Sequence, residues 1–325
     1  KSLRQFILNE FEILEINWLP ELVFAKAQVN TLVSIIRKST PHLIRVNIFD
    51  TLGLKSALKS QRIHNQRDFV DNDYFIGIFE DTSDTHLIKK VSEGRITLGE
   101  ITKPRSGYNP YEVGKGQAPS GGVHSAQTVK EKPYHSQKKL GKDWKPEIVG
   151  RDMDRYFVNV TGKRWIKYGP WLAAQRDPEN FKGKRILVQE ITGGRERRIV
   201  ATYYEGELYH SRDVIPIKII DDLPNPLYLL GIVNSKLITW YHHKRNPKAQ
   251  KGLFPKVLVS DLARLPIHSI NFSDPTYKAR HDRIVTSVEQ MLDLHNRLAT
   301  SQNAGERERL QRLIDSTDQQ IDALV

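Results

Sequence analysis

Alternating apolar and polar residues predict short strands along the first 65 residues. Phe11 to Ile16 alternates in this way, and His42 to Phe49 is a second short apolar run. Between them, Val23 to Arg37 ends in closely spaced aliphatic residues, a pattern typical of a buried strand. Alternation of strand and helix predicts one edge of an α/β sheet over residues 1–65. Residues 66–94 are polar with acidic clusters and predict a linker or a surface helix.

The middle of the chain changes from a loop pattern to a strand pattern and then to a helical one. Seven glycines lie between positions 94 and 122, so residues 95–149 predict long, functional loops. Apolar residues spaced about one turn apart after two prolines predict a helix over 227–242, and residues 265–267 predict a short closing strand or turn. Five apolar runs separated by turns predict a small mixed or antiparallel sheet, namely 155–160, 164–168, 185–191, 199–204 and 214–220.

The C-terminal 55 residues show a helical repeat. Apolar positions recur in steps of four and three residues from Ile284 to Leu298 and again from Leu310 to Leu324, with the turn Ser301 to Glu306 between them. Two narrow seams joined by a short loop predict an antiparallel helical hairpin over 271–325. The fold class predicted for the whole chain is therefore mixed α/β (α+β), with segments 1–65, 66–94, 95–270 and 271–325.

The excess of positive charge is confined to the middle of the chain. The 325 residues carry a formal net charge of +12, but residues 95–256 alone hold 30 Lys and Arg against 16 Asp and Glu. A basic block of this kind attracts a polyanion by neutralising phosphates and releasing counterions. A well-solvated basic surface is the alternative. The concentration of charge in one segment favours nucleic acid, and the absence of a basic amphipathic helix disfavours a membrane.

Several chemistries are absent from the sequence. The chain has no cysteine, which excludes disulfides, cysteine-based zinc sites and thiol nucleophiles, and fits a reducing cytoplasmic location. No phosphate-binding loop, zinc-protease or serine-hydrolase motif occurs. We therefore assign no catalytic residue and no metal ligand. Asn109-Pro110-Tyr111 resembles part of an amino-methyltransferase motif, but it lacks the second proline and its structural context.

Five strings in series resemble the TaqI-like C-terminal specificity domain, over about residues 95–270. This domain is the target-recognition half of bacterial N6-adenine DNA methyltransferases and of type IIG-like restriction–modification enzymes. The resemblance implies double-stranded DNA as the partner and sequence-specific binding as the function. The strings, followed by LPI at 265–267, are YNPYEVGKGQAP at 108–119, KEKPYHSQKKLGKDWKPEIVGRDMDRY at 130–156, WIKYGPWLAAQR at 165–176, FKGKRILVQEITG at 181–193 and LYLLGIVNSKLITWYH at 227–242.

The N-terminal flank adds to this resemblance. Leu3 to Lys38 is similar to the last strand–helix–strand portion of a Rossmann-like methyltransferase domain, so residues 1–65 are expected to be its C-terminal edge. The S-adenosylmethionine motif and the full catalytic motif are absent from these residues. The chain, which begins at Lys1, is thus expected to be a catalytically silent, cofactor-free piece. The missing methyltransferase portion, upstream or on a separate chain, would bind S-adenosylmethionine, and the parent protein carries a nuclease in some such enzymes.

Long polar side chains in the basic segment are the candidates for DNA contact. Arginine pairs naturally with guanine and glutamine with adenine, so the string QEITGGRERR predicts base readout by Gln189, Glu190, Arg195, Arg197 and Arg198. An exposed hairpin tip with solvated arginines is the alternative. The predicted backbone contacts, for which a solvated loop is the alternative, are Arg105, Tyr108, Tyr111, Lys115, Lys138, Lys139, Lys142, Lys244, Arg245, Lys248 and Lys251.

Two other interpretations compete with a module of a methyltransferase. The helical hairpin also fits a non-enzymatic specificity subunit that pairs with separate methyltransferase or nuclease chains. A general RNA-binding protein is a weaker alternative, because the signatures of RNA-binding modules are absent. Finally, the alternating charges of Arg151, Asp152, Asp154 and Arg155 predict internal salt bridges rather than DNA contacts.

Overall fold

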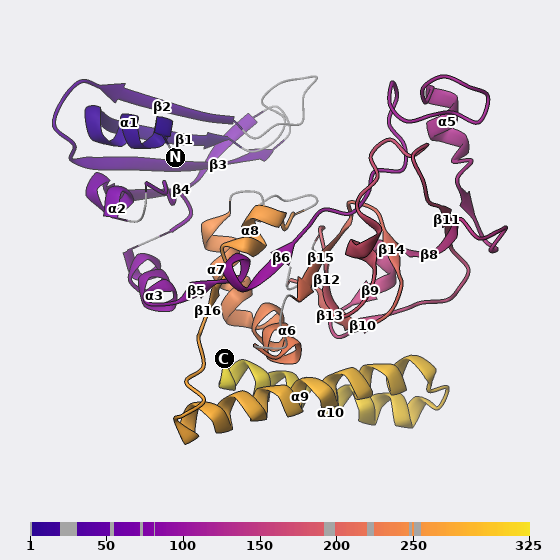
Figure 1. Cartoon of the computed structure of the whole chain (residues 1–325). Helices are drawn as coiled ribbons and strands as arrows, with labels where there is room; N and C mark the ends of the chain where they lie inside the picture. Colours follow the sequence, from indigo (N-terminus) through magenta and orange to yellow (C-terminus); the bar gives the residue numbers. More distant parts are fainter. Residues whose placement is uncertain are drawn as a thin grey trace. The chain divides into compact units, whose positions relative to one another are not determined.

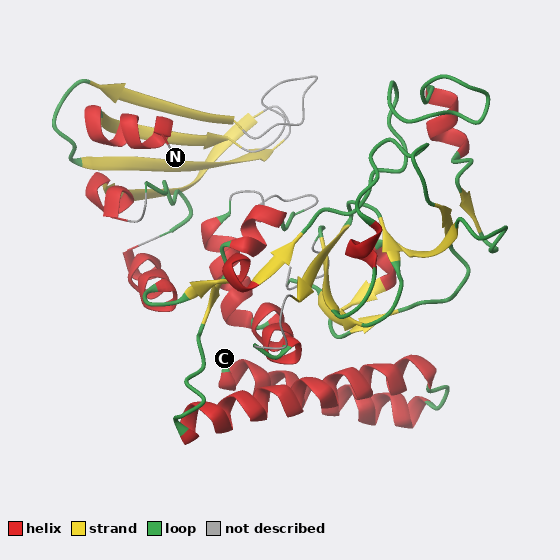
Figure 2. Ribbon diagram, viewed as in Figure 1, coloured by secondary structure: helices red, strands yellow, loops and turns green. Residues whose placement is uncertain are grey.

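The chain divides into two units, Lys1–Glu93 and Gly94–Val325, in a computed structural model (Figure 1). Each unit mixes helices with sheet, which confirms the predicted α/β class (Figure 2). The structure describes residues 2–19, 31–52, 55–71, 74–80, 82–191, 199–219, 224–246, 249 and 255–325.

The first unit is built on one sheet with the strand order β2-β1-β3-β4. Only β1 and β3 run parallel, while the other two pairings are antiparallel. One core cluster joins Ile16 and Trp18 of β1 to Val46 of β3 and to Phe69 of α2. The elements are α1 (Ser2–Glu10), β1 (Glu12–Leu19), β2 (Thr31–Arg37), β3 (Leu43–Leu52), β4 (Lys55–Asn65), α2 (Gln66–Asp71) and α3 (Thr82–Ser92).

The structure corrects two expectations for this unit. The strand at Thr31–Arg37 exists, but it lies at the sheet edge and exposes the aliphatic residues Leu32, Val33, Ile35 and Ile36, so the predicted burial is wrong. Residues 66–93 belong to the first unit, where a linker was one expectation, because α2 and the segment after it contribute to its core.

The second unit contains two four-stranded sheets. The first has the order β13-β12-β15-β6 and is antiparallel throughout, and the second has the order β14-β8-β11-β7. The strands are β5 (Ile96–Thr97), β6 (Thr102–Pro104), β7 (His135–Ser136), β8 (Trp144–Ile148), β9 (Met153–Asp154), β10 (Phe157–Val158), β11 (Trp165–Lys167), β12 (Arg185–Gln189), β13 (Ala201–Tyr204), β14 (Tyr209–His210), β15 (Val214–Ile219) and β16 (Pro266–Ile267).

The second unit also contains helices, and the last two form the predicted hairpin, which we call the arm. The helices are α4 (Leu98–Ile101), α5 (Ala126–Glu131), α6 (Pro226–Asn234), α7 (Lys236–Arg245), α8 (Val259–Ala263), α9 (Pro275–Thr300) and α10 (Ala304–Leu324), with 3-10 turns at Gly150–Asp152 and Pro178–Phe181. The predicted strands at 185–191, 199–204 and 214–220 are confirmed as β12, β13 and β15. The predicted closing strand is β16, which pairs antiparallel with β5.

Strand β12 is an inner strand of the first of these sheets, where it pairs with β13 on one side and β15 on the other. Its residues 185–188 are all buried, and helix α6 packs on β12 and β13. At its start, the fully buried Arg185 donates hydrogen bonds to the carbonyls of Gly183, Gly206 and Leu208 at 2.7, 2.8 and 3.0 Å. Burial lowers the pKa of Arg185 to about 10. These bonds make Arg185 a structural residue and close that end of the sheet.

The predicted helix over 227–242 is two helices, separated at Ser235. The Ser235 hydroxyl donates to the carbonyl of Ile232 at 2.7 Å and accepts from the amide of Ile238 at 3.2 Å. One side chain thus ends α6 and caps the start of α7. Apolar spacing continues across the break, which is why the pattern alone predicts one helix.

The predicted hairpin arm is confirmed as α9 and α10, whose seam residues Ile284, Val288, Leu310 and Ile314 are buried. Helix α6 packs against α9. A Cβ atom on Gly231 of α6 would lie only 2.9 Å from Ile284 and 3.0 Å from Val288, so glycine allows this close approach.

A partly buried ion pair fixes the arm as well. Arg155 donates to both carboxylate oxygens of Asp318 on α10, at 2.9 and 2.5 Å, and to the carbonyl of Asn234 at 3.1 Å. Asn234 in turn bonds both backbone groups of Ala201 on β13. The predicted structural role of Arg155 is confirmed, because this network joins the sheet, α6 and α10.

Replacing Gly231 tests the packing of the arm. A leucine at this position must displace Ile284 and Val288, so Gly231→Leu should lower the free energy of unfolding by about 1–3 kcal/mol. The matched control is Gly305→Ala, where the added methyl makes only ordinary contact with Asn303. Thermal or urea denaturation should show that control unchanged or more stable by up to about 1 kcal/mol. Equal effects of the two substitutions would contradict the close contact.

Candidate nucleic-acid interface

Backbone hydrogen bonds hold the glycine-rich loop, residues 107–122, to other parts of the second unit, for example from Asn109 to Ala174 at 2.8 Å and from Gln117 to Trp171 at 3.0 Å. Gly107 lies so close to Ser211 that a Cβ atom would be 2.0 Å from the Ser211 carbonyl oxygen. Gly116 has a positive φ of 65°, and a Cβ there would meet His124 and the carbonyl of Trp171. These two glycines therefore allow close packing within the second unit.

A chain of polar side chains lies under this loop. Tyr108 is fully buried, and its hydroxyl donates to Glu147, which also bonds Nε2 of His135 at 3.2 Å. Tyr111 bonds Nδ1 of His135 at 2.9 Å and accepts from the amide of Tyr134 at 2.8 Å. Burial, followed by the nearby Glu147 carboxylate, raises the pKa of Tyr108 well above its ordinary value. The network holds the loop to strand β8.

This network corrects one predicted DNA contact. The Tyr108 hydroxyl lies against Glu147 in the core, so it is not available to a phosphate. Tyr111 is only half-buried, but its hydroxyl has the two internal partners named above. The side-chain amide of Asn109 donates to the Glu112 carboxylate at 2.7 Å, which supports a structural role for Asn109-Pro110-Tyr111.

The end of strand β12 is the place where several chain segments meet. The amide of Glu190 donates to the carbonyl of Asp213 at 2.8 Å, and the Glu190 carbonyl accepts from Val257 at 2.8 Å. Ile191 and Lys256 form an antiparallel bridge beside them. Glu190 is thus held on both sides by backbone bonds, immediately before the arginine-bearing string at 192–198.

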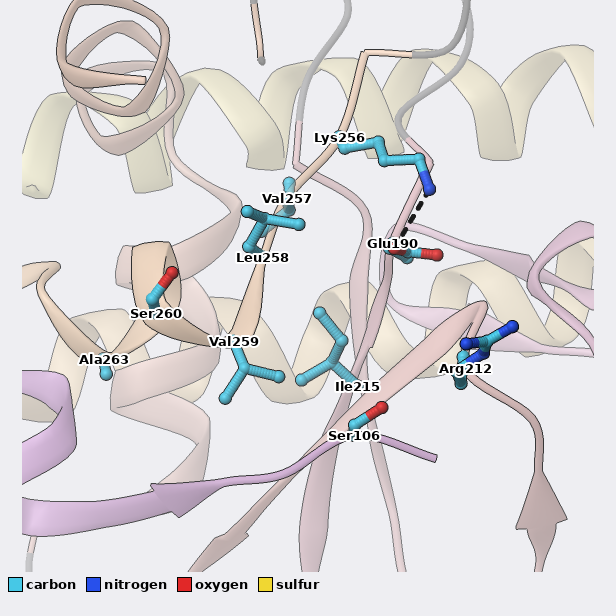
Figure 3. Close-up of a pocket in the computed structure, with 10 residues that line it drawn as sticks. All are labelled: Ser106, Glu190, Arg212, Ile215, Lys256, Val257, Leu258, Val259, Ser260 and Ala263. Atoms are coloured by element: carbon cyan, nitrogen blue, oxygen red, sulfur yellow. Dashed lines mark hydrogen bonds and ion pairs between the residues drawn. The ribbon is translucent and has the colours of Figure 1, made fainter. Parts of the chain in front are cut away.

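A cavity of about 720 Å³ opens at this strand end (Figure 3). Its charged residues are Glu190, Arg212 and Lys256, which Figure 3 shows gathered on one side. Lys256 forms an ion pair with Glu190 at 3.2 Å. The remaining lining is small or apolar and consists of Ser106, Ile215, Val257, Leu258, Val259, Ser260 and Ala263.

The predicted base-reading residues are only partly within the described structure. Gln189 ends β12 and packs over Gly150, and Glu190 lies at the cavity rim. Arg195, Arg197 and Arg198 lie outside the described residues. Base readout by all five stays a prediction.

The predicted phosphate-contacting lysines and arginines occupy different places in the second unit. Arg105 is exposed just after β6, where its amide donates to Pro216, and Lys115 pairs with Glu112 at 2.7 Å. Lys244 and Arg245 are half-buried in the last turn of α7. Lys248 and Lys251 lie outside the described residues. An exposed loop between β7 and β8 carries Lys138, Lys139 and Lys142, and Lys139 lies 5.7 Å from the ring centre of Trp165.

Two charged residues of the cavity rim are absent from the sequence-based set. Arg212 lies in the exposed turn between β14 and β15, and Lys256 lies in an apolar string just before α8. Neither belongs to a run of basic residues, so charge clustering along the chain does not single them out. Only the pairing of distant segments brings them to Glu190.

The described residues contain no group of three or more His, Cys, Asp or Glu side chains placed to hold a metal ion. Within the same residues, no helix combines the length and apolar character needed to cross a membrane.

Residues 145–267 match the family model of the TaqI-like C-terminal specificity domain. The predicted family is confirmed for this segment. The matched segment includes strands β8 to β16 from residue 145 onward, the end of β12 and nine of the ten residues that line the cavity, all but Ser106.

A relative and two solved structures match nearly the whole chain. A Methanocaldococcus jannaschii protein that bears the name of a type II restriction enzyme and methyltransferase is 23% identical over 322 residues. That match covers 97% of this chain but only 25% of the relative. The chain therefore spans about a quarter of the length of the curated relative that it matches.

The two solved structures are restriction–modification proteins. The type IIL enzyme MmeI, solved in complex with DNA, gives a TM-score of 0.49 at 10% identity, over 97% of this chain and 43% of that chain. The type IIG restriction endonuclease BpuSI gives a TM-score of 0.41 at 11% identity, over 98% of this chain and 45% of that chain.

The buried His210 of strand β14 makes the stability of the fold depend on pH. Burial and the nearby Arg185 lower its pKa to about 3, whereas the unfolded chain binds a proton near the ordinary histidine value of about 6.5. The stabilisation is present above pH 6.5 and is lost as the pH falls towards 3. As the pH falls from 6 to 4, the free energy of unfolding of the parent chain should decrease more steeply than that of His210→Phe, by up to about 1.4 kcal/mol per pH unit. Denaturation at each pH measures both. The exposed control His86→Phe should keep the parental slope.

Proposed function

We propose that the second unit binds duplex DNA and selects the target site of a restriction–modification enzyme. The family match over residues 145–267 carries this proposal. The excess of 14 positive charges over residues 95–256 supports it, because a basic surface binds DNA by releasing counterions. The neutral or acidic flanks do not share this excess.

The way charged side chains are used inside the unit supports the same proposal. Arg155 and Arg185 make internal hydrogen bonds and have structural roles. The predicted contacts Arg105, Lys138 and Lys142 are exposed. Among the described residues, their side chains form neither hydrogen bonds nor ion pairs. Exposed cations on a fixed framework are available for phosphates, while the polar residues at the end of β12 are available for base edges.

Catalysis belongs to the finer part of the proposal. A methyltransferase portion outside these 325 residues would bind S-adenosylmethionine and modify adenine at N6, and the present chain would choose the sequence. Residues 1–65 would be the edge of that methyltransferase domain, and the exposed aliphatic residues of edge strand β2 fit a surface that another element covers.

The helical arm favours a second candidate, a specificity subunit that serves separate catalytic chains. Helices α9 and α10 are 26 and 21 residues long and are anchored to the second unit by Gly231 and Arg155. The full-length protein distinguishes the two candidates. Methylation of duplex DNA by one chain with S-adenosylmethionine supports the first, whereas activity only after a separate catalytic chain is added supports the second.

Binding to duplex DNA should depend steeply on salt. Each phosphate neutralised contributes about −0.9 to the slope of log K against log salt concentration, so several contacts give a slope of several units. Fluorescence anisotropy with a labelled duplex at a series of salt concentrations measures this slope. A flat response would contradict an electrostatic interface.

The two kinds of predicted contact should respond differently to substitution. The double variant Arg195→Ala/Arg197→Ala should relax sequence preference more than overall affinity, because bidentate contacts to a base discriminate by about 1–3 kcal/mol each. The matched control Lys138→Ala/Lys142→Ala should weaken binding to all sequences alike. Selection from a random duplex library, followed by sequencing, measures both. A uniform loss from the arginine variant would reassign Arg195 and Arg197 to phosphates.

A further inference from the structure

We infer that the charged rim of the cavity is a preformed reading element, in which Lys256 positions Glu190 for a base edge and Arg212 contacts a phosphate. This inference rests on the proposed DNA-binding function and names the residues that carry out part of it. Neither Arg212 nor Lys256 is among the residues that the sequence indicates.

Glu190 is held rigidly at the end of β12. Backbone bonds to Asp213 and Val257 hold it on both sides, and its side chain is only 21% exposed. The arginine-bearing string at 192–198 begins two residues after it in the sequence. A side chain fixed in this way is better suited to discriminate base edges than one that must be ordered on binding.

Glu190 offers one carboxylate oxygen as a hydrogen-bond acceptor. Lys256 bonds Oε1 at 3.2 Å, and within the described part of the chain Oε2 makes no hydrogen bond. A free carboxylate near DNA would repel phosphates, but the Lys256 ammonium offsets this charge. The remaining oxygen only accepts hydrogen bonds, so it fits the amino group of cytosine or adenine in the major groove.

Arg212 lies in a turn that hydrogen bonds hold in place. Its turn is fixed because Asp213 accepts hydrogen bonds from Gly150 at 2.6 Å and from Ser211 at 2.6 Å. Backbone atoms of Tyr108 and Ser211 form a further bridge beside it. The Arg212 side chain itself is exposed and shares the cavity rim with Glu190 (Figure 3). A cation on a rigid turn beside a reading side chain is placed to fix the register of the DNA backbone.

Arg212 is tested by its effect on salt dependence. Arg212→Ala should reduce the magnitude of the salt slope by about 0.9 and leave the preferred sequence unchanged. The control is Arg283→Ala, an exposed arginine on α9 that should leave the slope unaltered although it removes the same charge. An equal change in both variants, or a relaxed sequence preference in Arg212→Ala, would overturn the assignment.

Glu190 and Lys256 are tested by library selection with the same full chain. Glu190→Gln and Lys256→Met should both relax or alter the preference at one shared base pair by about tenfold or more. Lys256→Arg should restore it, since arginine keeps the ion pair. The melting temperature is measured in parallel. A loss of melting temperature and affinity without any change in base preference would show that the pair is merely structural.

The results separate this inference from the proposed function. If the parent chain shows no affinity for duplex DNA in low salt, the proposed function fails. If the parent chain selects a sequence but all the rim variants select the same sequence with the same salt slope, only the inference fails.

Discussion

The backbone hydrogen bonds at the end of strand β12 are the constraint on which the candidate interface depends. Glu190 is joined to Asp213 and to Val257, so the turn after β14 and the segment before α8 converge on one residue. Burial keeps β12 in place, because it pairs on both edges and packs against α6. The buried guanidinium of Arg185 satisfies three carbonyls at its opposite end. Without this strand, Glu190, Arg212 and Lys256 would not be brought together around the cavity.

Internal bonds use many of the polar groups that a basic sequence makes attractive as ligand contacts. Glu147 bonds both Tyr108 and His135 beneath the glycine-rich loop, and Arg155 binds Asp318 on the arm. A buried polar group without a partner is costly, so such residues are recruited to the framework. The side chains left exposed, such as Arg105 and Arg212, are therefore more informative about function than the total charge.

The sequence predicts local periodicity well and long-range pairing poorly. Strands β12, β13 and β15 and the helices of the arm follow from their apolar spacing, which depends on neighbouring residues alone. The exposure of β2 does not, because whether a strand lies at an edge depends on which other strands pair with it. The helix break at Ser235 depends on one hydroxyl, and the rim residue Lys256 reaches Glu190 only through tertiary structure. The resemblance located the specificity domain, but it did not locate the cavity.

The central physical claim is that one preformed surface of the second unit faces the double helix. Amide hydrogen exchange of the chain, with and without a duplex selected by the protein itself, tests it most directly. The expected result is protection concentrated at residues 105–107, 189–191, 211–213 and 255–257, which meet around the cavity. Protection confined to the helical arm or to the first unit, with these four segments unchanged, would contradict the claim.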